Sequence, residues 1–225
     1  MFDDFCKRCK AVRAALNLAE TRGWGDTSLA DIAQEAGLSL ADLRREFTCK
    51  SDILRAFQRE VDAEVLAKAK AAGEAQSPRD RLFDLIMTRF ELMAPYKGGL
   101  KRVVAYLSCR PGESAMFLCS ALGSQYWMLA GAGAKLDGAG AALRVTGLTA
   151  IYGKVFHVWL DDDTPSLDKT MAALDKRLAG GERMLNRAES ACKDFCRVAC
   201  GFLPRGWKRG EVPPAAPTPP SAAPA

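Results

Sequence analysis

Apolar residues recur every three or four positions along most of the chain, and this spacing is typical of α-helices. Alternating patterns of the kind that predict strands are nearly absent. The periodicity predicts helices over residues 3–21, 27–36, 39–47, 51–72, 78–95, 98–109, 112–131, 139–160 and 166–203. The chain is therefore expected to be all-α.

Three of these helices begin with a serine that is followed by an acid three residues later, an arrangement that satisfies free N–H groups of the first turn. The pairs are Ser28 with Asp31, Ser39 with Asp42, and Ser77 with Asp80. Residues 73–77 read as a linker before the third pair. The tail after residue 210 is rich in proline and alanine, cannot bury a core, and is expected to be disordered.

Composition and charge change this picture little. The chain of 225 residues is 48% apolar and 26% charged, as in an ordinary globular protein, and its net charge is +5. The basic excess falls in residues 175–210, which hold nine basic and four acidic residues. No secretory signal precedes the first helix, so the eight cysteines are expected to be reduced thiols in a cytoplasmic protein.

Residues 29–43 have the spacing of a helix-turn-helix. Gly37 can adopt the left-handed backbone that the tight turn requires, and Ala33 is small where the two helices cross. The core between the helices is expected to consist of Ile32, Ala36, Leu38 and Leu43. The second helix of such a unit presents its early residues to the major groove of DNA. Here these are Ser39, Leu40, Ala41, Arg44 and Arg45.

Over about its first fifty-five residues the chain resembles the TetR family of bacterial regulators. The matching positions are residues 19–24, 27–33 and 36–39, with Leu43, Phe47, Lys50 and Leu54. The resemblance implies a TetR-like fold and a homodimer joined through its last helices. It places Thr27, Leu40, Arg44, Arg45 and Lys50 near double-stranded DNA. Arg44 stands where the family usually has an aromatic residue, and can bind a phosphate or a guanine in its place.

The expected organisation follows from this resemblance. Residues 1–50 form a three-helix DNA-binding domain, and residues 51–76 form a connecting helix and linker. Residues 77–209 form a larger helical domain for ligand binding and dimerisation, and residues 210–225 form the tail. The leading hypothesis is a ligand-responsive transcriptional regulator.

A second resemblance covers about a tenth of the chain, at residues 162–177. Asp162, Thr164, Thr170, Leu174 and Arg177 are similar to a C-terminal pattern of the coenzyme Q accessory lipid-binding family, which also has a TetR-like fold. It implies a pocket for an isoprenoid or other lipid. The alternative function is therefore a lipid-binding accessory protein of ubiquinone biosynthesis that does not bind DNA.

Apolar and aromatic residues of the second domain could line a pocket for an apolar small molecule or lipid, with a few polar groups among them. The candidates are Phe83, Met87, Phe90, Gln125, Tyr126, Trp127 and His157. Aromatic residues and methionines at helical spacing also serve as plain core, and both interpretations stay open. His157 equally suits a hydrogen-bonded interface.

Residues 183–209 combine basic and apolar residues at helical spacing. Such a helix can pack in a dimer bundle or make peripheral contact with a membrane surface, and both alternatives stay open. Residues 114–134 carry no charge, but their polar residues favour a buried helix over a membrane span.

No metal, cofactor or catalytic site is expected. Cys6 and Cys9 have the spacing of a metal-binding pair, but no second pair or histidine group completes a four-ligand site. His157 is the only histidine, and no serine lies in a nucleophile elbow. Phosphate-binding and dinucleotide motifs are also missing, so an enzyme is not expected.

Overall fold

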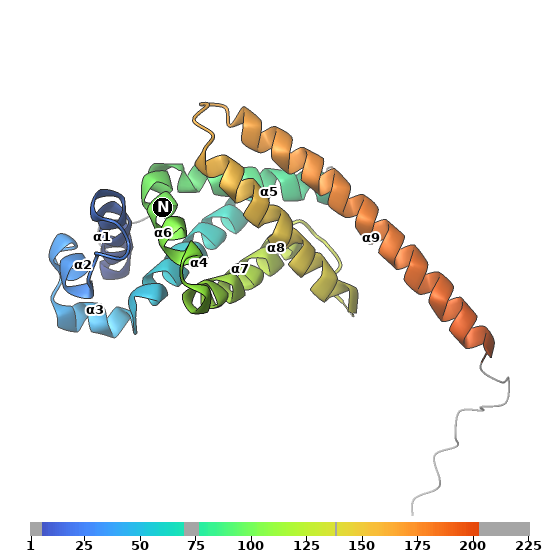
Figure 1. The fold of residues 1–225 in the computed structure, drawn as a ribbon, viewed down its shortest axis with the longest axis horizontal. Coiled ribbons are helices and arrows are strands. Elements are labelled where there is room, and N and C mark those ends of the chain that lie inside the picture. The colour runs from blue at the N-terminus through green and yellow to red at the C-terminus, as the bar shows by residue number, and fades with distance from the viewer. Residues whose placement is uncertain (1–5, 70–76, 138, 203–225) are drawn as a thin grey trace, which may run out of the picture. The chain divides into compact units, whose positions relative to one another are not determined.

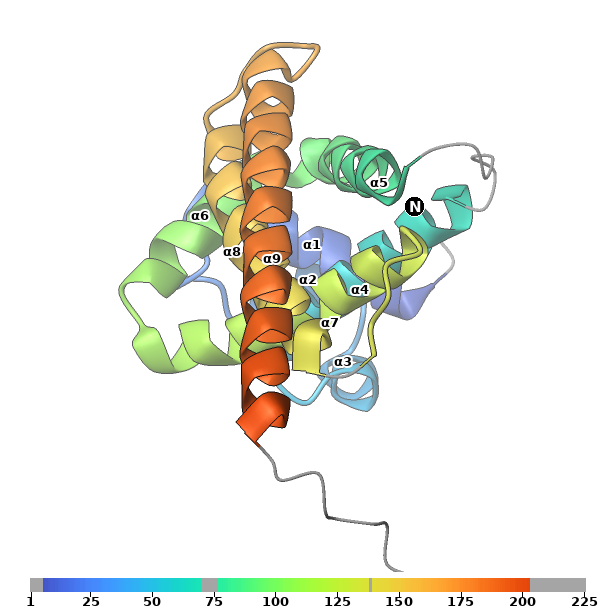
Figure 2. The ribbon, with the colours of Figure 1, turned by 90° about the vertical axis from the view of Figure 1, so that its right-hand side faces the viewer.

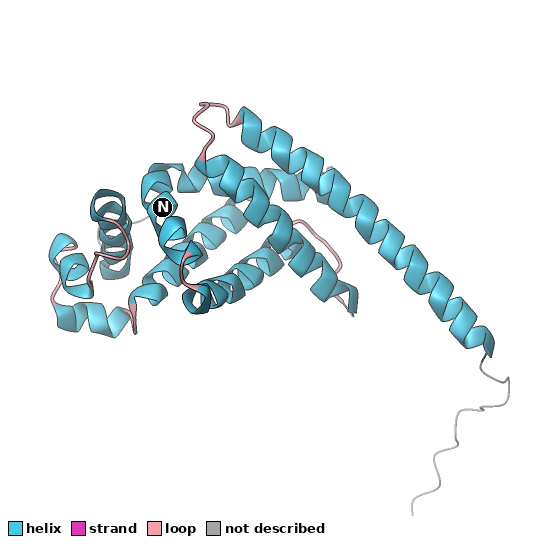
Figure 3. Ribbon diagram, in the orientation of Figure 1, coloured by secondary structure: helices cyan, strands magenta, loops and turns pink. Residues whose placement is uncertain are grey.

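The computed structural model describes residues 6–69, 77–137 and 139–202, and within these ranges it contains helices and no strand (Figure 3). The all-α prediction is confirmed. The predicted linker and the proline-rich tail lie outside the described residues.

The observed helices follow the predicted ones closely, with ends that differ by a few residues. They are α1 (Lys7–Arg22), α2 (Leu29–Glu35), α3 (Leu40–Glu46), α4 (Lys50–Ala69), α5 (Pro78–Met93), α6 (Lys97–Ser108), α7 (Pro111–Gly131), α8 (Ala139–Leu160) and α9 (Asp168–Phe202). A short 3-10 turn, η1 (Ala94–Tyr96), joins α5 to α6 at Pro95 and was not predicted.

The three predicted helix starts are confirmed. The backbone N–H of Asp31 donates to the Ser28 hydroxyl at 3.1 Å, and the Asp31 carboxylate accepts from the Ser28 backbone, which completes a capping box. The N–H of Asp42 donates to Ser39, and that of Asp80 donates to Ser77. Each serine therefore satisfies an N–H group that has no partner within its helix.

The chain divides into two compact units, residues 1–183 and residues 184–225. Helix α4 packs on α1 at one end and on α5 and α7 further along, so the helices on either side of residue 50 belong to one compact unit. Within the first unit, α1, α2 and α3 lie together at one end, on the left of Figure 1, and α4, α5, α7 and α8 pack on one another beside them (Figures 1 and 2).

Helix α6 packs closely against α1 and joins helices α1 to α3 to the rest of the unit. The contact is made at Gly99, which is buried. A Cβ atom at this position would overlap the carbonyl oxygen of Leu16 and would lie 3.1 Å from its carbonyl carbon. Only a residue without a side chain allows α6 to approach the backbone of α1 this closely.

Helix α7, where a buried helix was expected over residues 114–134, is buried on one side only. Ser124, Gln125, Met128 and Leu129 face the core, whereas Met116 and Trp127 are 52% and 57% exposed. The uncharged segment therefore combines a core face with an exposed apolar face. Within the described residues, no helix is both long and apolar enough to cross a membrane.

The turn between α8 and α9 is built around the buried carboxylate of Asp162. One carboxylate oxygen accepts from the backbone N–H and hydroxyl of Thr164, and the other accepts from the same groups of Thr170, at 2.6–3.2 Å. Burial raises the pKa of Asp162, but these hydrogen bonds outweigh it and hold the pKa well below its ordinary value. The sequence pattern at residues 162–177 therefore has a structural role in starting α9.

Replacing Gly99 by alanine should force α6 away from α1 and lower the free energy of unfolding by about 1–3 kcal/mol, as overpacking typically does. The matched control is Gly123→Ala, because Gly123 lies within α7 and a Cβ there meets nothing within 4 Å. That control should be neutral or slightly stabilising. Urea denaturation of both variants measures the difference, and equal stability would show that the α1–α6 contact is not tight.

Replacing Asp162 by asparagine should lower the free energy of unfolding by about 2 kcal/mol at pH 7, because an amide cannot accept all four hydrogen bonds. A depressed folded-state pKa stabilises the fold above the unfolded pKa of about 4, and this contribution is lost as the pH falls further. The difference from wild type should therefore shrink in acid. Asp163→Asn, at an exposed neighbour, is the control, and an equal effect in both variants would contradict the assigned role.

Candidate DNA-binding and ligand sites

Helices α2 and α3 form the predicted helix-turn-helix. The turn closes through a hydrogen bond from the N–H of Leu38 to the carbonyl oxygen of Ala33 at 2.9 Å, and Gly37 has a φ of 65°. Ile32 and Leu43 are fully buried between the helices. The local geometry is therefore fixed by the core residues and the turn glycine that the spacing predicts.

The outer face of α3 carries the predicted recognition residues. Ser39, Leu40, Ala41, Arg44 and Arg45 are all exposed, and Leu40 is 56% exposed although it is apolar. An exposed leucine beside two arginines suits a surface that meets both base edges and phosphates.

Charge on this face is arranged around Asp42 in the first turn of α3. Its carboxylate accepts from Lys7 of α1 at 2.7 Å and from Arg45 at 3.3 Å. The hydrogen bonds from Lys7 and Ser39 lower the pKa of Asp42 to about 2. Lys7 thus compensates the one acidic group that would repel a phosphate at the start of α3. No ion pair involves Arg44 within the described part of the chain.

The family resemblance places Thr27 and Lys50 near DNA. In the structure, both side chains make contacts within the protein. Thr27 is buried, and its hydroxyl donates to the carbonyl oxygen of Gly23 at 2.8 Å. The Lys50 ammonium donates to the carbonyl oxygens of Trp24 and Thr27 and lies 4.6 Å from the centre of the Trp24 ring. Burial lowers the pKa of Lys50. Both side chains therefore hold the loop between α1 and α2 in the protein without DNA, and their contact with DNA stays a prediction.

In the second half of the unit, α5 and α8 share a cluster of aromatic rings. The Phe90 ring stacks on those of Tyr152 and Trp159 with centroids 5.4 Å apart in each pair, and Phe156 lies beside all three. Phe90 and Trp159 are fully buried, and Met87 is nearly so. Of the predicted ligand residues, the structure thus brings Met87 and Phe90 into the core.

Beside these rings lies a buried ion pair that the sequence did not indicate. The Arg89 guanidinium contacts the Asp62 carboxylate and the Ser124 hydroxyl, and Ser124 donates to Asp62 at 2.9 Å. Arg89 is 2% exposed and lies 5.1 Å from the centre of the Tyr152 ring. Burial raises the pKa of Asp62, against the opposing effect of Arg89. The one hint in the sequence was Arg89 itself, a charged residue on the apolar face of α5.

Within the described residues, four buried side-chain nitrogen and oxygen atoms have no hydrogen-bond partner. They are Nε of Arg89, both amide atoms of Gln125, and Nε1 of Trp159. Gln125 is 0% exposed and follows Ser124, which contacts Arg89. Leaving a buried polar group unsatisfied costs about 1–3 kcal/mol. A core with four such atoms is a candidate binding site.

The remaining predicted ligand residues do not join this core. Tyr126 and Trp127 are exposed because Gln125 and Met128 occupy the inward face of α7, and His157 is exposed on α8. Their side chains therefore lie outside the aromatic core, and the interface interpretation of His157 stays open. The helical period was right, but the sequence did not show which side of α7 faces inward.

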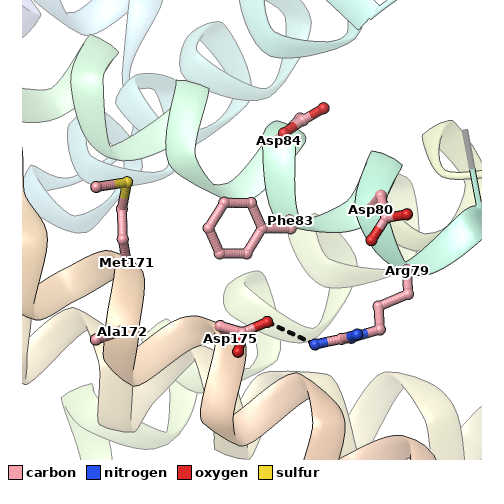
Figure 4. A pocket seen from close by; sticks show the side chains of 7 residues that line it. All are labelled: Arg79, Asp80, Phe83, Asp84, Met171, Ala172 and Asp175. Carbon is pink, nitrogen blue, oxygen red and sulfur yellow. Dashed lines mark hydrogen bonds and ion pairs between the residues drawn. The ribbon is translucent and has the colours of Figure 1, made fainter.

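Phe83 lines a groove between α5 and the first turns of α9, with a volume of about 440 Å³ (Figure 4). Met171 lies on the opposite wall, and an ion pair between Arg79 and Asp175 crosses the groove. Phe83, Met87 and Phe90 are spaced by four and three residues, so they share one face of α5. The groove therefore begins about two helical turns from the buried aromatic cluster.

No group of three or more histidine, cysteine or acidic side chains that could hold a metal ion occurs in the described part of the chain. Cys6 and Cys9 lie at the start of α1.

The exposed arginines of α3 should contribute to DNA affinity but not to the stability of the folded protein. Arg44→Ala and Arg45→Ala should each weaken DNA binding about tenfold and reduce the slope of log Kd against log salt by about one, with the melting temperature unchanged. Lys135→Ala, at an exposed cation beyond the far end of α7, is the matched control and should bind DNA like wild type. Equal affinities in all three variants would contradict the proposed interface.

Comparisons with known proteins agree with this geometry. The family model of bacterial regulatory proteins of the tetR family matches residues 11–57, which span α1 to the first turns of α4. No curated protein matches the chain.

Similar solved structures cover most of the chain. A TetR transcriptional regulator from Nitrosomonas europaea is 22% identical, with a TM-score of 0.64 over 78% of this chain and 97% of that one. FadR of Thermus thermophilus, a TetR-family repressor solved in complex with lauroyl-CoA, is 18% identical, with a TM-score of 0.52 over 94% and 100%. Residues 11–57 are therefore similar to bacterial regulatory proteins of the tetR family, and the chain has the fold of the TetR-family regulator structures that it matches.

Proposed function

We propose that this protein is a homodimeric transcriptional regulator that binds DNA through α3 and releases or engages it in response to a small molecule. The observation that carries the proposal is the exposed face of α3, where Leu40, Arg44 and Arg45 project from a buried helix-turn-helix core. Lys7 compensates the acidic Asp42 beside them. This face has the shape and charge that major-groove binding requires.

The proposed ligand site is the core around Phe90, Arg89 and Gln125. Its support is the combination of stacked rings with buried polar atoms that have no partner. A separate groove lies at Phe83, further along the same face of α5. The Thermus thermophilus repressor was solved with lauroyl-CoA, a ligand with an apolar acyl chain, and by analogy we propose a ligand with an apolar part for this chain.

The proposed mechanism couples the two sites through packed helices. Helix α5 continues through η1 into α6, and α6 lies against α1 at Gly99. A ligand that separates α5 from α7 would therefore move α6 and reorient α1 with its recognition helix. It can do so only by binding one of the two arrangements more tightly than the other.

Dimer formation through α8 and α9 is part of the proposal and follows the family resemblance. Exposed apolar side chains support it, since Leu143 on α8 is 41% exposed. Two copies are needed to present two recognition helices to successive major grooves.

The comparisons give no support to the alternative of a lipid-binding accessory protein without DNA binding. Three residues of the sequence pattern that suggested it, Asp162, Thr164 and Thr170, are joined by hydrogen bonds at the start of α9. The proposed membrane contact through residues 183–209 rests on side chains that, beyond Arg187, lie outside the described residues.

Selection of genomic fragments by the full-length protein tests the proposal. We expect enrichment of fragments that share a two-fold symmetric site, whose footprint places the half-sites about one helical turn of DNA apart or a multiple of it. The double variant Arg44→Ala/Arg45→Ala should lose the enrichment while remaining folded. Recovery of random fragments by both proteins, even at low salt, would contradict the assignment.

A further inference from the structure

We infer that Cys6 and Cys9 form a reversible oxidation site, at which a hydroperoxide joins the two thiols in a disulfide and so weakens the DNA-binding face beside them. The effect on DNA rests on the proposed function, whereas the disulfide does not. The proposed function itself uses neither cysteine.

The two cysteines occupy the N-cap and the third residue of α1. Cys6 has an extended backbone, with φ −85° and ψ 117°, and Cys9 lies in the first helical turn. An N-cap side chain in this conformation can fold back over the third residue, as the capping serines of α2, α3 and α5 do. Both cysteines are free and only partly buried, so a small oxidant can reach them.

The two thiols already interact with each other. A hydrogen bond between the side chains of Cys6 and Cys9 lowers the pKa of the Cys6 thiol, against the opposing effects of burial and of the Glu46 carboxylate. The start of a helix also favours the negative charge of a thiolate. Because the thiolate is the form that attacks an oxidant, Cys6 is the attacking residue and Cys9 is the second thiol of the pair.

The proposed reaction consumes one hydroperoxide and oxidises both sulfurs. The Cys6 thiolate attacks the O–O bond and becomes a sulfenic acid, and the alkoxide that leaves takes up the proton that Cys6 released. The Cys9 sulfur then attacks the Cys6 sulfur, the S–S bond forms, and the hydroxyl group leaves as water with the proton of Cys9. The hydroperoxide is thus reduced to an alcohol and water, and a thiol reductant restores both thiols.

Formation of the disulfide changes the first turn of α1. Side chains three residues apart on a helix have Cβ atoms about 5–6 Å apart, whereas a disulfide joins Cβ atoms about 3.5–4.5 Å apart. Cys9 packs against the apolar core of the first unit, which limits its movement. The change therefore falls mainly on Cys6 and on the two residues between the cysteines.

These two residues, Lys7 and Arg8, contact the helix-turn-helix and the residue that follows it. The Lys7 ammonium pairs with Asp42 of α3 at 2.7 Å, and the Arg8 guanidinium lies 5.3 Å from the centre of the Phe47 ring. Displacement of this turn separates Lys7 from Asp42 and leaves a less compensated carboxylate beside the DNA phosphates. Because like charges repel, oxidation should weaken DNA binding.

Mass spectrometry of the full-length protein treated with cumene hydroperoxide tests the disulfide. Cleavage after glutamate releases residues 1–20, which contain Cys6 and Cys9 and no other cysteine. We expect this fragment to lose two hydrogens on oxidation and to regain them with dithiothreitol. Cys6→Ser and Cys9→Ser should each abolish the change, whereas Cys109→Ser, at an exposed thiol after α6, is the control and should not. A fragment that keeps its hydrogens, or that stops at a sulfenic or sulfinic acid on Cys6, would overturn the inference.

DNA binding by the reduced and oxidised protein tests the consequence, with a fragment that the reduced protein selects. Oxidation should weaken binding about two- to fivefold, the size expected for the loss of one exposed ion pair, and dithiothreitol should restore it. Reduced Lys7→Ala should bind about as weakly as the oxidised wild type, and Cys9→Ser should not respond to the oxidant. Equal binding by both forms of the wild type would overturn the inference. A reduced protein that selects no DNA contradicts the proposed function alone, because the mass of the 1–20 fragment does not depend on DNA.

Discussion

The close approach of α6 to the backbone of α1 is the contact on which the arrangement of this protein depends. Gly99 lies where any side chain would overlap the carbonyl oxygen of Leu16, so the two helices meet backbone to backbone. Packed interfaces of this kind shift between discrete arrangements and do not deform smoothly. A displacement of α6 must therefore be followed by α1, and with it by the helix-turn-helix.

The core around Phe90 contrasts with the tight α1–α6 contact. Around Phe90 the rings are closely stacked, but Arg89, Gln125 and Trp159 keep polar atoms without partners. A core selected for stability alone would replace such atoms with apolar ones. Retained polar atoms in a buried position are explained most simply if a bound molecule completes them. The protein then gives up some stability in the free state and regains it with the ligand.

The helix-turn-helix was predictable from sequence because its determinants are local. The Ser28–Asp31 and Ser39–Asp42 pairs fix helix starts, Gly37 fixes the turn, and Ile32 and Leu43 fill a core between neighbouring segments. Each signal lies within a few residues of its effect. The exposed residues of α3 followed from the same local geometry, and their exposure in the structure agrees with the prediction.

The proposed ligand core was only partly predictable because its determinants are distant in sequence. Asp62 and Arg89 are twenty-seven residues apart, and no sequence pattern near either residue indicates that the two form an ion pair. On α7, the helical period was correct, but only packing decides that Gln125 faces inward and Trp127 outward. Lys50 was likewise predicted to lie near DNA because it matches the family pattern. In the fold its ammonium group donates to the carbonyl oxygens of Trp24 and Thr27.

The most direct test of this account is amide hydrogen exchange in the full-length protein, with and without a DNA duplex that it selects. Coupling between two sites is reciprocal, so DNA binding at α3 must alter the core even when no ligand is present. The account predicts changed exchange in α6 near Gly99 and in α5 and α7 near Arg89 and Gln125, as well as in α1 to α3. Changes confined to α1, α2 and α3 would contradict the coupling through α6.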